Sequence, residues 1–154
     1  MSRQLRKARA PDAGAIHKLI NAAAKTSQVL PRSLNNVCEH VRDFVIMEEE
    51  SAVIGCCALH VSWEDLAEIR SLVVDEKQQG QGIGRQLVDA CLKDAVLLGI
   101  NRVFLLTAQR GFFEKLGFQE VDKATLPHKI WRDCMECVQF PDCCEVALIK
   151  ELKR

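Results

Sequence analysis

The spacing of apolar residues along the chain alternates between the period of a strand and the period of a helix. Short runs of about four to eight residues, bounded by polar or turn-forming residues, predict strands. The expected strands are Leu5–Ala8, Phe44–Met47, Val53–His60, Ala67–Val74, Arg102–Leu106 and Glu145–Ile149. The acidic segment 48–51 is expected to form the hairpin turn between the second and third of them.

The expected helices have recognisable starts and stops. Pro11 opens the first helix, and Ser33 caps the second. A long amphipathic helix covers Ile83–Leu98, a short one covers Gly111–Leu116, and a glycine follows each of them. The element order is therefore β-α-α-β-β-β-α-β-α-β, which indicates an α/β layer fold with meander strands first and crossover helices later.

Length, charge and composition limit the class of protein. The 154 residues suit a single domain, expected to span 1–154, and 21 basic residues balance 21 acidic ones. That balance argues against nucleic-acid binding and against a polybasic membrane-surface role. No apolar run is long enough to span a bilayer, and the N-terminal segment lacks the apolar core of a signal peptide, so a cytoplasmic location is expected.

Three glycines at alternate positions, Gly80, Gly82 and Gly84, separate the expected strand Ala67–Val74 from the long helix. The first turn of a helix has backbone N–H groups without an intrahelical partner, and glycines let a phosphate approach them. The loop is therefore expected to cradle an anion, most simply a pyrophosphate, with a plain tight turn as the alternative. The spacing differs from the G-x-G-x-x-G of dinucleotide-binding folds, and no Gly-Lys-Ser/Thr follows to make a Walker loop.

Two motifs of the chain occur in succession, Gln79-Gly80-Gln81-Gly82-Ile83-Gly84 and Phe112–Phe118. The first is similar to the Q/R-x-x-G-x-G/A motif, and the second resembles the F-[FY]-x-x-x-G-F element, of the GCN5-related N-acetyltransferase (GNAT) superfamily. The strand Ala67–Val74 stands where that superfamily has its central acetyl-CoA strand. The resemblance covers essentially the whole chain. It implies a mixed, mostly antiparallel central sheet, flanked by helices and splayed at the acetyl-CoA strand.

Other segments resemble the acetyltransferase domain of N-acetylglutamate synthases, with the closest likeness to short stand-alone members. They are Val29–Ser33, Asp43–Ile46, Ile54–Leu59, Leu105–Thr107 and the tail from Leu126 to Cys143. This resemblance implies transfer of acetyl from acetyl-CoA to the α-amino group of an amino acid, with L-glutamate, and hence arginine biosynthesis, as the best interpretation. The alternatives are another small amine, a protein amine, or a non-catalytic module that senses acetyl-CoA or a metal.

The same resemblance assigns contacts with the cosubstrate. Main-chain groups of the central strand would hold the pantetheine arm and the carbonyl, N–H groups of the glycine loop would hold the pyrophosphate, and two aromatic rings would pack on the arm unless they are core residues. These positions are Leu72, Val73 and Val74, then Gln79, Gly80, Gln81, Gly82, Ile83 and Gly84, and then Phe112 and Phe113.

Acetyl transfer needs a base for the amine, donors for the oxyanion and a way for the thiolate to leave. Glu68 matches the catalytic glutamate of some superfamily members and would act through a water. The alternative is a charge pair with Arg70, since strict alternation puts Glu68, Arg70, Leu72 and Val74 on one face of the strand. The chain has no tyrosine to protonate the thiolate, and Phe113 stands at that place, so the acid is a water, another group or absent.

Glutamate carries two carboxylates, so a glutamate site needs cationic partners. Arg32 matches one of the paired arginines of N-acetylglutamate synthases, whereas Pro31 stands in place of the other. Arg70 is the candidate for the second cation, and the alternative for Arg32 is a solvated residue at the start of a helix. The sequence carries no signal for oligomeric state, although domains of this superfamily often pair as homodimers.

Four of the eight cysteines gather in the segment 127–144. Cys134-x-x-Cys137 is a common half of a zinc site, which Cys143, Cys144 or His128 would complete, and an iron–sulfur ligation also fits the count. A disulfide and reduced free thiols stay open as alternatives. The remaining cysteines lie on expected apolar faces and are interpreted as core residues. They are Cys38, Cys56, Cys57 and Cys91.

Overall fold

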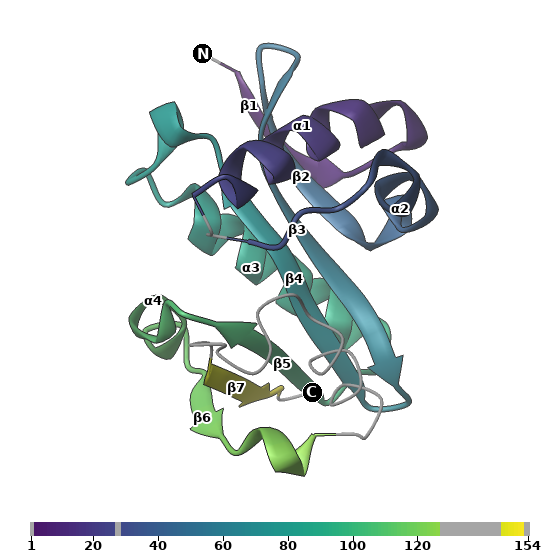
Figure 1. The fold of residues 1–154 in the computed structure, drawn as a ribbon. Coiled ribbons are helices and arrows are strands. Elements are labelled where there is room, and N and C mark those ends of the chain that lie inside the picture. Colours follow the sequence, from purple (N-terminus) through teal and green to yellow (C-terminus); the bar gives the residue numbers. More distant parts are fainter. Residues whose placement is uncertain (1, 27–28, 127–145, 153–154) are drawn as a thin grey trace.

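The computed structural model describes residues 2–26, 29–126 and 146–152 of the chain. Within these residues, one sheet has the strand order β1-β2-β3-β4-β5-β7-β6 (Figure 1). The strands are β1 Arg3–Lys7, β2 Phe44–Glu49, β3 Ala52–Trp63, β4 Leu66–Val74, β5 Arg102–Thr107, β6 Gln119–Val121 and β7 Val146–Glu151. Neighbouring strands are antiparallel except for β4 and β5, which are parallel. The expected mixed, mostly antiparallel sheet is confirmed.

Helices and 3₁₀ turns connect these strands. The helices are α1 Ala13–Ala24, α2 Leu34–Glu39, α3 Ile83–Leu97 and α4 Arg110–Glu114, and the 3₁₀ turns are η1 Ala10–Asp12, η2 Val41–Asp43, η3 Glu76–Gln78 and η4 Lys123–Thr125. The start of α2 is the one its sequence predicts, because the Ser33 hydroxyl accepts a hydrogen bond from the Asn36 N–H.

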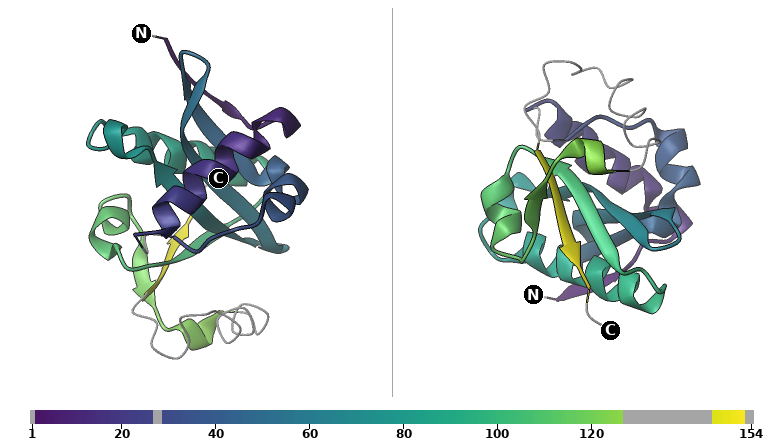
Figure 2. Two further views of the ribbon diagram at one scale, coloured as in Figure 1. Left: turned by 45° about the horizontal axis from the view of Figure 1, so that its top comes forward. Right: turned by 90° about the horizontal axis from the view of Figure 1, so that it is seen from below.

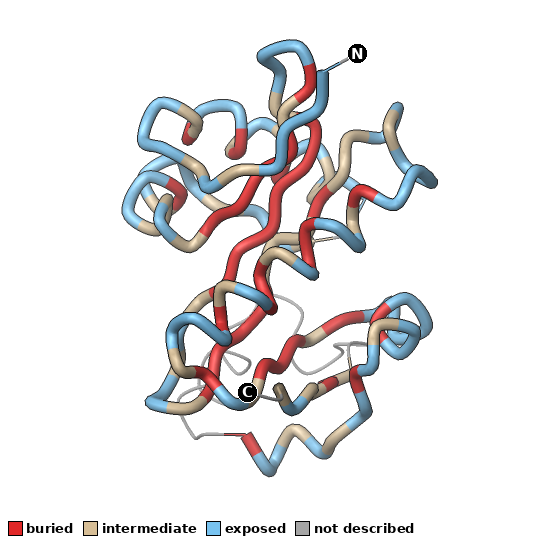
Figure 3. The backbone as a smooth tube through the Cα atoms, turned by 180° about the vertical axis from the view of Figure 1, so that it is seen from behind, coloured by how far each residue is buried: buried red, intermediate tan, exposed pale blue. Residues whose placement is uncertain are grey.

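Helices cover both faces of the sheet (Figures 1 and 2). On one face, α3 contributes Leu87 to a core that also contains Leu59 of β3. On the other face, α1 contributes Ile16 to a second core with Phe44 of β2. Figure 3 shows the buried backbone running along the central strands between these two layers. The apolar stripes of the helices thus meet the two faces of the sheet, as the sequence pattern predicts.

The parallel pair β4–β5 is short and then opens. Residues 66–68 of β4 pair with residues 102–104 of β5, and the register between these two strands ends there. β5 continues against β7, and β7 pairs in turn with β6. Figure 1 shows β5, β7 and β6 set apart from the sheet half that contains β1 to β4. The expected splay beside this central strand is confirmed, and it begins just after Glu68.

A bulge in β4 reverses the direction of its side chains beyond Arg70. Ser71 has a φ of 53°, and the register with β3 passes from Ala58↔Arg70 to Cys56↔Val73, so two residues of β4 lie opposite one of β3. Leu72 and Val74 therefore pack with the α3 core, whereas Val73 packs with the α1 core. The prediction that Glu68, Arg70, Leu72 and Val74 share one face is wrong, because the bulge shifts the alternation by one residue.

The hairpin between β2 and β3 is tighter than the acidic segment predicts. Only residues 50–51 form the turn, both with positive φ, while Glu48 and Glu49 remain in β2. Their carboxylates pair with β1, where Arg6 lies 2.7 Å from Glu48 and Arg3 lies 3.1 Å from Glu49. The acidic residues belong to the strand because arginines on the neighbouring strand satisfy them.

Two further elements differ from the sequence prediction. The strand β6 was not predicted, because its three residues, Gln119–Val121, include two polar ones and carry no readable period. Cys38 is exposed and not a core residue, since the short helix α2 buries Val37 toward the sheet and turns Cys38 outward. The prediction of buried free thiols is confirmed for the other three cysteines in the described part, which are Cys56, Cys57 and Cys91.

Candidate active site

The glycine loop follows β4 directly, where the splay has opened. Gly82 is the N-cap of α3, and Gly80 and Gly82 have φ values of 81° and 80°. L-residues with a side chain rarely adopt this left-handed conformation. A Cβ added at either glycine would meet no atom within 4 Å. The backbone conformation is therefore what requires glycine, and the space beside the loop is open to a ligand.

The start of α3 provides the donors that an anion needs. Because the helix begins at Ile83, the N–H groups of its first turn have no acceptor within the helix, and the positive end of the helix dipole lies there. The Gln86 N–H donates to the Gly82 carbonyl at 3.2 Å. The loop and the helix start together form a site suited to a phosphate or pyrophosphate group.

The glutamine side chains of the loop are held by hydrogen bonds to β1 and β4. The Gln79 carboxamide donates to the Val74 carbonyl at 3.2 Å. The Arg3 guanidinium donates to the carboxamides of Gln78 and Gln81, and it also pairs with Glu49. The glutamine side chains of the motif thus hold the loop in shape, which leaves backbone N–H groups as its donors toward a ligand.

The two predicted aromatic residues have different environments. Phe112 of α4 is 37% exposed, and its ring lies 3.4 Å from the position of a Cβ on Gly84. Phe113 is 5% exposed and belongs to the α3 core, where it makes an edge contact with Phe118. Phe112 is thus a partly exposed ring beside the start of α3, whereas Phe113 is a core aromatic.

Glu68 and Arg70 form an ion pair on the α1 side of the sheet. Arg70 Nε lies 2.5 Å from Glu68 Oε1. Glu68 is 8% exposed, and its position in the register is opposite His60 of β3 and Phe104 of β5. The charge pair that the sequence left as an alternative is therefore present. It places a buried carboxylate at the point where β4 and β5 separate.

Arg32 is held over the same region of the sheet, which excludes the interpretation as a solvated residue. Its Nε donates to Asn36 Oδ1 at 2.6 Å, its Nη1 donates to Ser71 Oγ at 3.1 Å, and its guanidinium lies 5.1 Å from the centre of the Phe44 ring. Burial, and then repulsion from Arg70, lower the pKa of Arg32. Two cations, Arg32 and Arg70, therefore lie near one another, and among the described residues the hydrogen-bond partners of the Arg32 side chain are the neutral Asn36 and Ser71.

The structure also brings in residues that the sequence did not single out. Ser71, at the bulge of β4, receives the hydrogen bond from Arg32, and its carbonyl accepts from the Cys56 thiol at 3.4 Å. His60 Nδ1 lies 2.9 Å from Asp43 Oδ2. A histidine at the end of an apolar strand was a signal that could have drawn attention to His60. Nothing in the sequence marks Ser71, because a bulge depends on the pairing of two strands.

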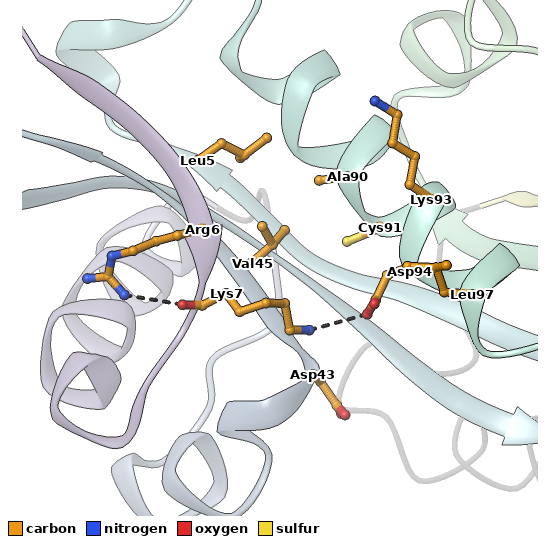
Figure 4. A pocket seen from close by; sticks show the side chains of 10 residues that line it. All are labelled: Leu5, Arg6, Lys7, Asp43, Val45, Ala90, Cys91, Lys93, Asp94 and Leu97. Atoms are coloured by element: carbon orange, nitrogen blue, oxygen red, sulfur yellow. Dashed lines mark hydrogen bonds and ion pairs between the residues drawn. The ribbon is translucent and has the colours of Figure 1, made fainter.

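A separate pocket lies away from the splay (Figure 4). It has a volume of ≈ 260 Å³ and lies between the edge formed by β1 and β2 and the helix α3. Lys7 and Asp94 pair across it at 3.3 Å, and Cys91 contributes to its wall. None of the predicted catalytic or binding residues lines it, so we place the site at the splay.

The metal prediction falls on Cys134, Cys137 and Cys143, which lie outside the described residues. Among residues 2–26, 29–126 and 146–152, no group of three histidine, cysteine or acidic side chains has an arrangement that could hold a metal ion. None of the helices in this part of the chain combines the length and apolar character that crossing a bilayer requires.

Comparison with known proteins decides the family. The model of the acetyltransferase (GNAT) family matches residues 14–118, a span that contains β4, the glycine loop and the Phe112–Phe118 element. The chain belongs to the GNAT acetyltransferase family. An N-acetyltransferase of Chlorobaculum tepidum, itself uncharacterised, is 44% identical over 96% of both chains. The amino-acid acetyltransferase of Mycobacterium tuberculosis is 40% identical over 77% of this chain and 69% of its own length.

Solved GNAT structures share this fold. A Mycobacterium tuberculosis protein solved in complex with CoA has a TM-score of 0.83 at 31% identity, over 97% of this chain and 99% of its own. The N-acetylglutamate synthase of Neisseria gonorrhoeae, solved with coenzyme A and N-acetyl-glutamate, has a TM-score of 0.90 at 28% identity. The match covers 100% of this chain but 36% of the synthase. The GNAT chain described here is thus an acetyl-CoA-dependent N-acetyltransferase.

Proposed function

We propose that this GNAT enzyme acetylates the α-amino group of an amino acid, with L-glutamate as the preferred acceptor, as in arginine biosynthesis. The observation that carries the proposal is the pair of cations beside the splay. Arg32 is partly buried, its side chain donates to the neutral Asn36 and Ser71, and Arg70 lies close enough to lower its pKa. Two neighbouring guanidinium groups suit an acceptor that brings carboxylates. The names of the Mycobacterium and Neisseria relatives support the same substrate class.

The proposed cosubstrate site follows β4 into the glycine loop. Main-chain groups of residues 72–74 would hold the pantetheine arm and the thioester carbonyl, because β4 has left β5 at this point and its edge faces the splay. N–H groups of residues 79–84 would hold the pyrophosphate. Phe112, which is 37% exposed, would pack against the arm. Phe113 would support it from the core.

The proposed chemistry uses the buried carboxylate at the apex of the splay. Glu68 would take a proton from the acceptor ammonium through a water, so that the amine can attack the thioester carbonyl. The developing oxyanion would be stabilised by backbone N–H groups at the bulge, near Leu72. A thiol with an ordinary pKa of about 8–9 can depart as the thiolate. The enzyme therefore does not require a tyrosine in the position that Phe113 occupies.

The test is acetyl transfer to a panel of amino acids and amines, followed by thiol detection of released CoA. Arg32→Ala should raise the KM for glutamate at least about tenfold, because a charge-assisted contact contributes about 1.5–3 kcal/mol. The affinity for acetyl-CoA should stay unchanged. Arg32→Lys should restore little, since it lacks the planar fork of donors.

A matched control is Arg102→Ala, which removes an arginine whose pair with Asp65 lies at the closed end of the β4–β5 junction. It should leave both KM values near those of the wild type. Equal turnover of glutamate and of amines that lack a carboxylate would refute the amino-acid assignment and favour a different small amine or a protein amine as acceptor.

A further inference from the structure

Asp43 and His60 form a carboxylate–imidazole pair beside Glu68. Asp43 ends η2 and His60 lies in β3, and Oδ2 of the first is 2.9 Å from Nδ1 of the second. Their side chains are 26% and 27% exposed, so the pair lies at the boundary between the interior and solvent. An aspartate that accepts from Nδ1 fixes the proton of a neutral imidazole on that nitrogen, which leaves Nε2 as the proton acceptor of the ring.

The register of the sheet places this pair next to the proposed base. His60 is directly opposite Glu68 in the antiparallel pairing of β3 and β4. Directly opposed residues point to the same face with Cβ atoms about 4.5–5.5 Å apart. The two side chains therefore project from the same face of the sheet, the face covered by α1 and α2. Glu68 lies at the apex of the splay, and His60 lies one strand closer to β1.

The ring of His60 is also restrained by α2. The ring centre of His40, the C-cap residue of α2, lies 5.7 Å from that of His60, and the two ring planes are tilted by 59°. His40 Nδ1 is itself 2.8 Å from the Asn36 carbonyl, which holds this second ring in place. Asn36 also accepts the hydrogen bond from Arg32, so the proposed acceptor site and the histidine pair share one framework.

The charged groups around His60 come from each neighbouring element. Asp43 faces it from η2, His40 from α2, and Glu68 with its partner Arg70 from β4. Arg32 interacts with the charges of both Asp43 and Glu68 from the loop before α2. Glu68 thus lies close to several other titratable groups rather than alone in an apolar core.

As the proposed base, Glu68 must pass the proton that it takes up to solvent in every turnover. A carboxylate that is 8% exposed and ion-paired at 2.5 Å has little direct contact with bulk water. Carboxyl groups ordinarily titrate near pH 4.3 and imidazoles near 6.5, so an imidazole is the better proton carrier at about neutral pH. His60 lies opposite Glu68 in the sheet and is more exposed, so its ring is suited to pass a proton to solvent.

We propose that His60, oriented by Asp43, carries the acceptor's proton from Glu68 to solvent. The inference rests on the proposed role of Glu68. The N–H bond of the ammonium breaks and its proton moves, directly or through a water, to a carboxylate oxygen of Glu68, while the nitrogen lone pair becomes free to attack. The proton then passes to Nε2 of His60, giving an imidazolium stabilised by Asp43, and leaves to water, which restores both groups.

The experiment compares kcat, at saturating acetyl-CoA and acceptor, across pH 5.5–9.5 for the wild type, His60→Gln and Asp43→Asn. His60→Gln should lower kcat at pH 7 by about tenfold or more, with the deficit shrinking toward high pH, where hydroxide accepts the proton. Added imidazole should restore part of the lost rate, and the KM for acetyl-CoA should stay within about twofold of the wild-type value. Asp43→Asn keeps the shape of the side chain but removes the carboxylate, so kcat should fall in the same pH range.

His17→Gln is the matched control, because this histidine of α1 forms no hydrogen bond or ion pair through its ring within the described part of the chain. Its pH profile should match that of the wild type.

An unchanged profile for His60→Gln, or a pH-independent loss that imidazole does not restore, overturns the proton route while leaving the proposed function intact. Failure of the wild type to acetylate any amine overturns the proposed function and the proton route together. If His60→Gln fails to fold, Asp43→Asn alone decides, because a wild-type profile in that variant contradicts the role of the pair.

Discussion

The conformation of the glycine loop leads to a quantitative prediction for Gly82. This residue has a φ of 80° at the N-cap of α3, and a Cβ there would meet nothing within 4 Å. Gly82→Ala therefore introduces no collision, and its whole effect comes from backbone strain. A left-handed conformation costs an L-residue about 1–2 kcal/mol. We expect the free energy of unfolding to fall by about that amount.

The same strain sets the expected changes in melting temperature and in affinity. One kcal/mol corresponds to about 2–4 °C in a domain of this size, so the Tm of Gly82→Ala should fall by about 2–8 °C. If the loop instead relaxes in the free protein, the Tm changes less, binding must restore the left-handed form, and the same free energy should raise the Kd for acetyl-CoA by about five- to thirtyfold. Gly82→Asn should show smaller changes in Tm and in affinity for acetyl-CoA, because asparagine tolerates this conformation better than alanine does.

Differential scanning calorimetry and isothermal titration with acetyl-CoA measure these two effects. Gly84→Ala is the matched control, since Gly84 lies in the first turn of α3 and a Cβ there would make an ordinary 3.4 Å contact with Phe112. Alanine is favoured over glycine in a helix by about 1 kcal/mol, so the Tm should not fall. A Gly82→Ala protein with the Tm and affinity of the wild type would refute the argument, because the loop would then not need the left-handed conformation.

Three further predictions concern the site and the pH dependence of stability. Glu68→Gln should lower the rate by about a hundredfold near neutral pH, with a smaller deficit at high pH; a pH-independent loss together with a lower Tm would instead indicate a broken pair with Arg70. Ser71→Gly, which permits the left-handed bulge, should keep the Tm nearer to that of the wild type than Ser71→Ala does, and calorimetry of the two variants checks this. The hydrogen bond from Arg6 lowers the pKa of Asp12 in the folded protein. The Arg6–Asp12 pair therefore stabilises the fold fully at pH values above the ordinary aspartate pKa of 3.8, and this stabilisation is lost as the pH falls below 3.8. Asp12→Asn should flatten that acid limb in denaturant titrations.

Much of the fold is encoded in local patterns that need no tertiary structure. The apolar period of 83–98 predicts α3, and the hydroxyl of Ser33 predicts the start of α2, because both depend on neighbours within about one helical turn. The glycines of the loop are equally local, since a positive φ is a property of one residue and its own side chain. The sequence therefore predicted the position of the glycine loop and most of the sheet.

The tertiary structure decided which side chains meet beside the splay. The bulge at Ser71 arises from the pairing of β4 with β3, and it sends Leu72 and Val74 to the opposite face from Glu68 and Arg70. Simple alternation along a strand cannot reveal such a shift, because it assumes an uninterrupted pleat.

Sequence patterns likewise could not predict contacts between residues that are distant in the chain. Arg32 reaches Ser71 across 39 positions, and Asp43 reaches His60 across 17. Each of these side chains has several solvated alternatives in an isolated segment, and only the packing of α1 and α2 on the sheet restricts them to one arrangement. The sequence thus determined where the glycine loop and the central strand lie, whereas tertiary packing determined which cations, carboxylates and histidines gather at the proposed site.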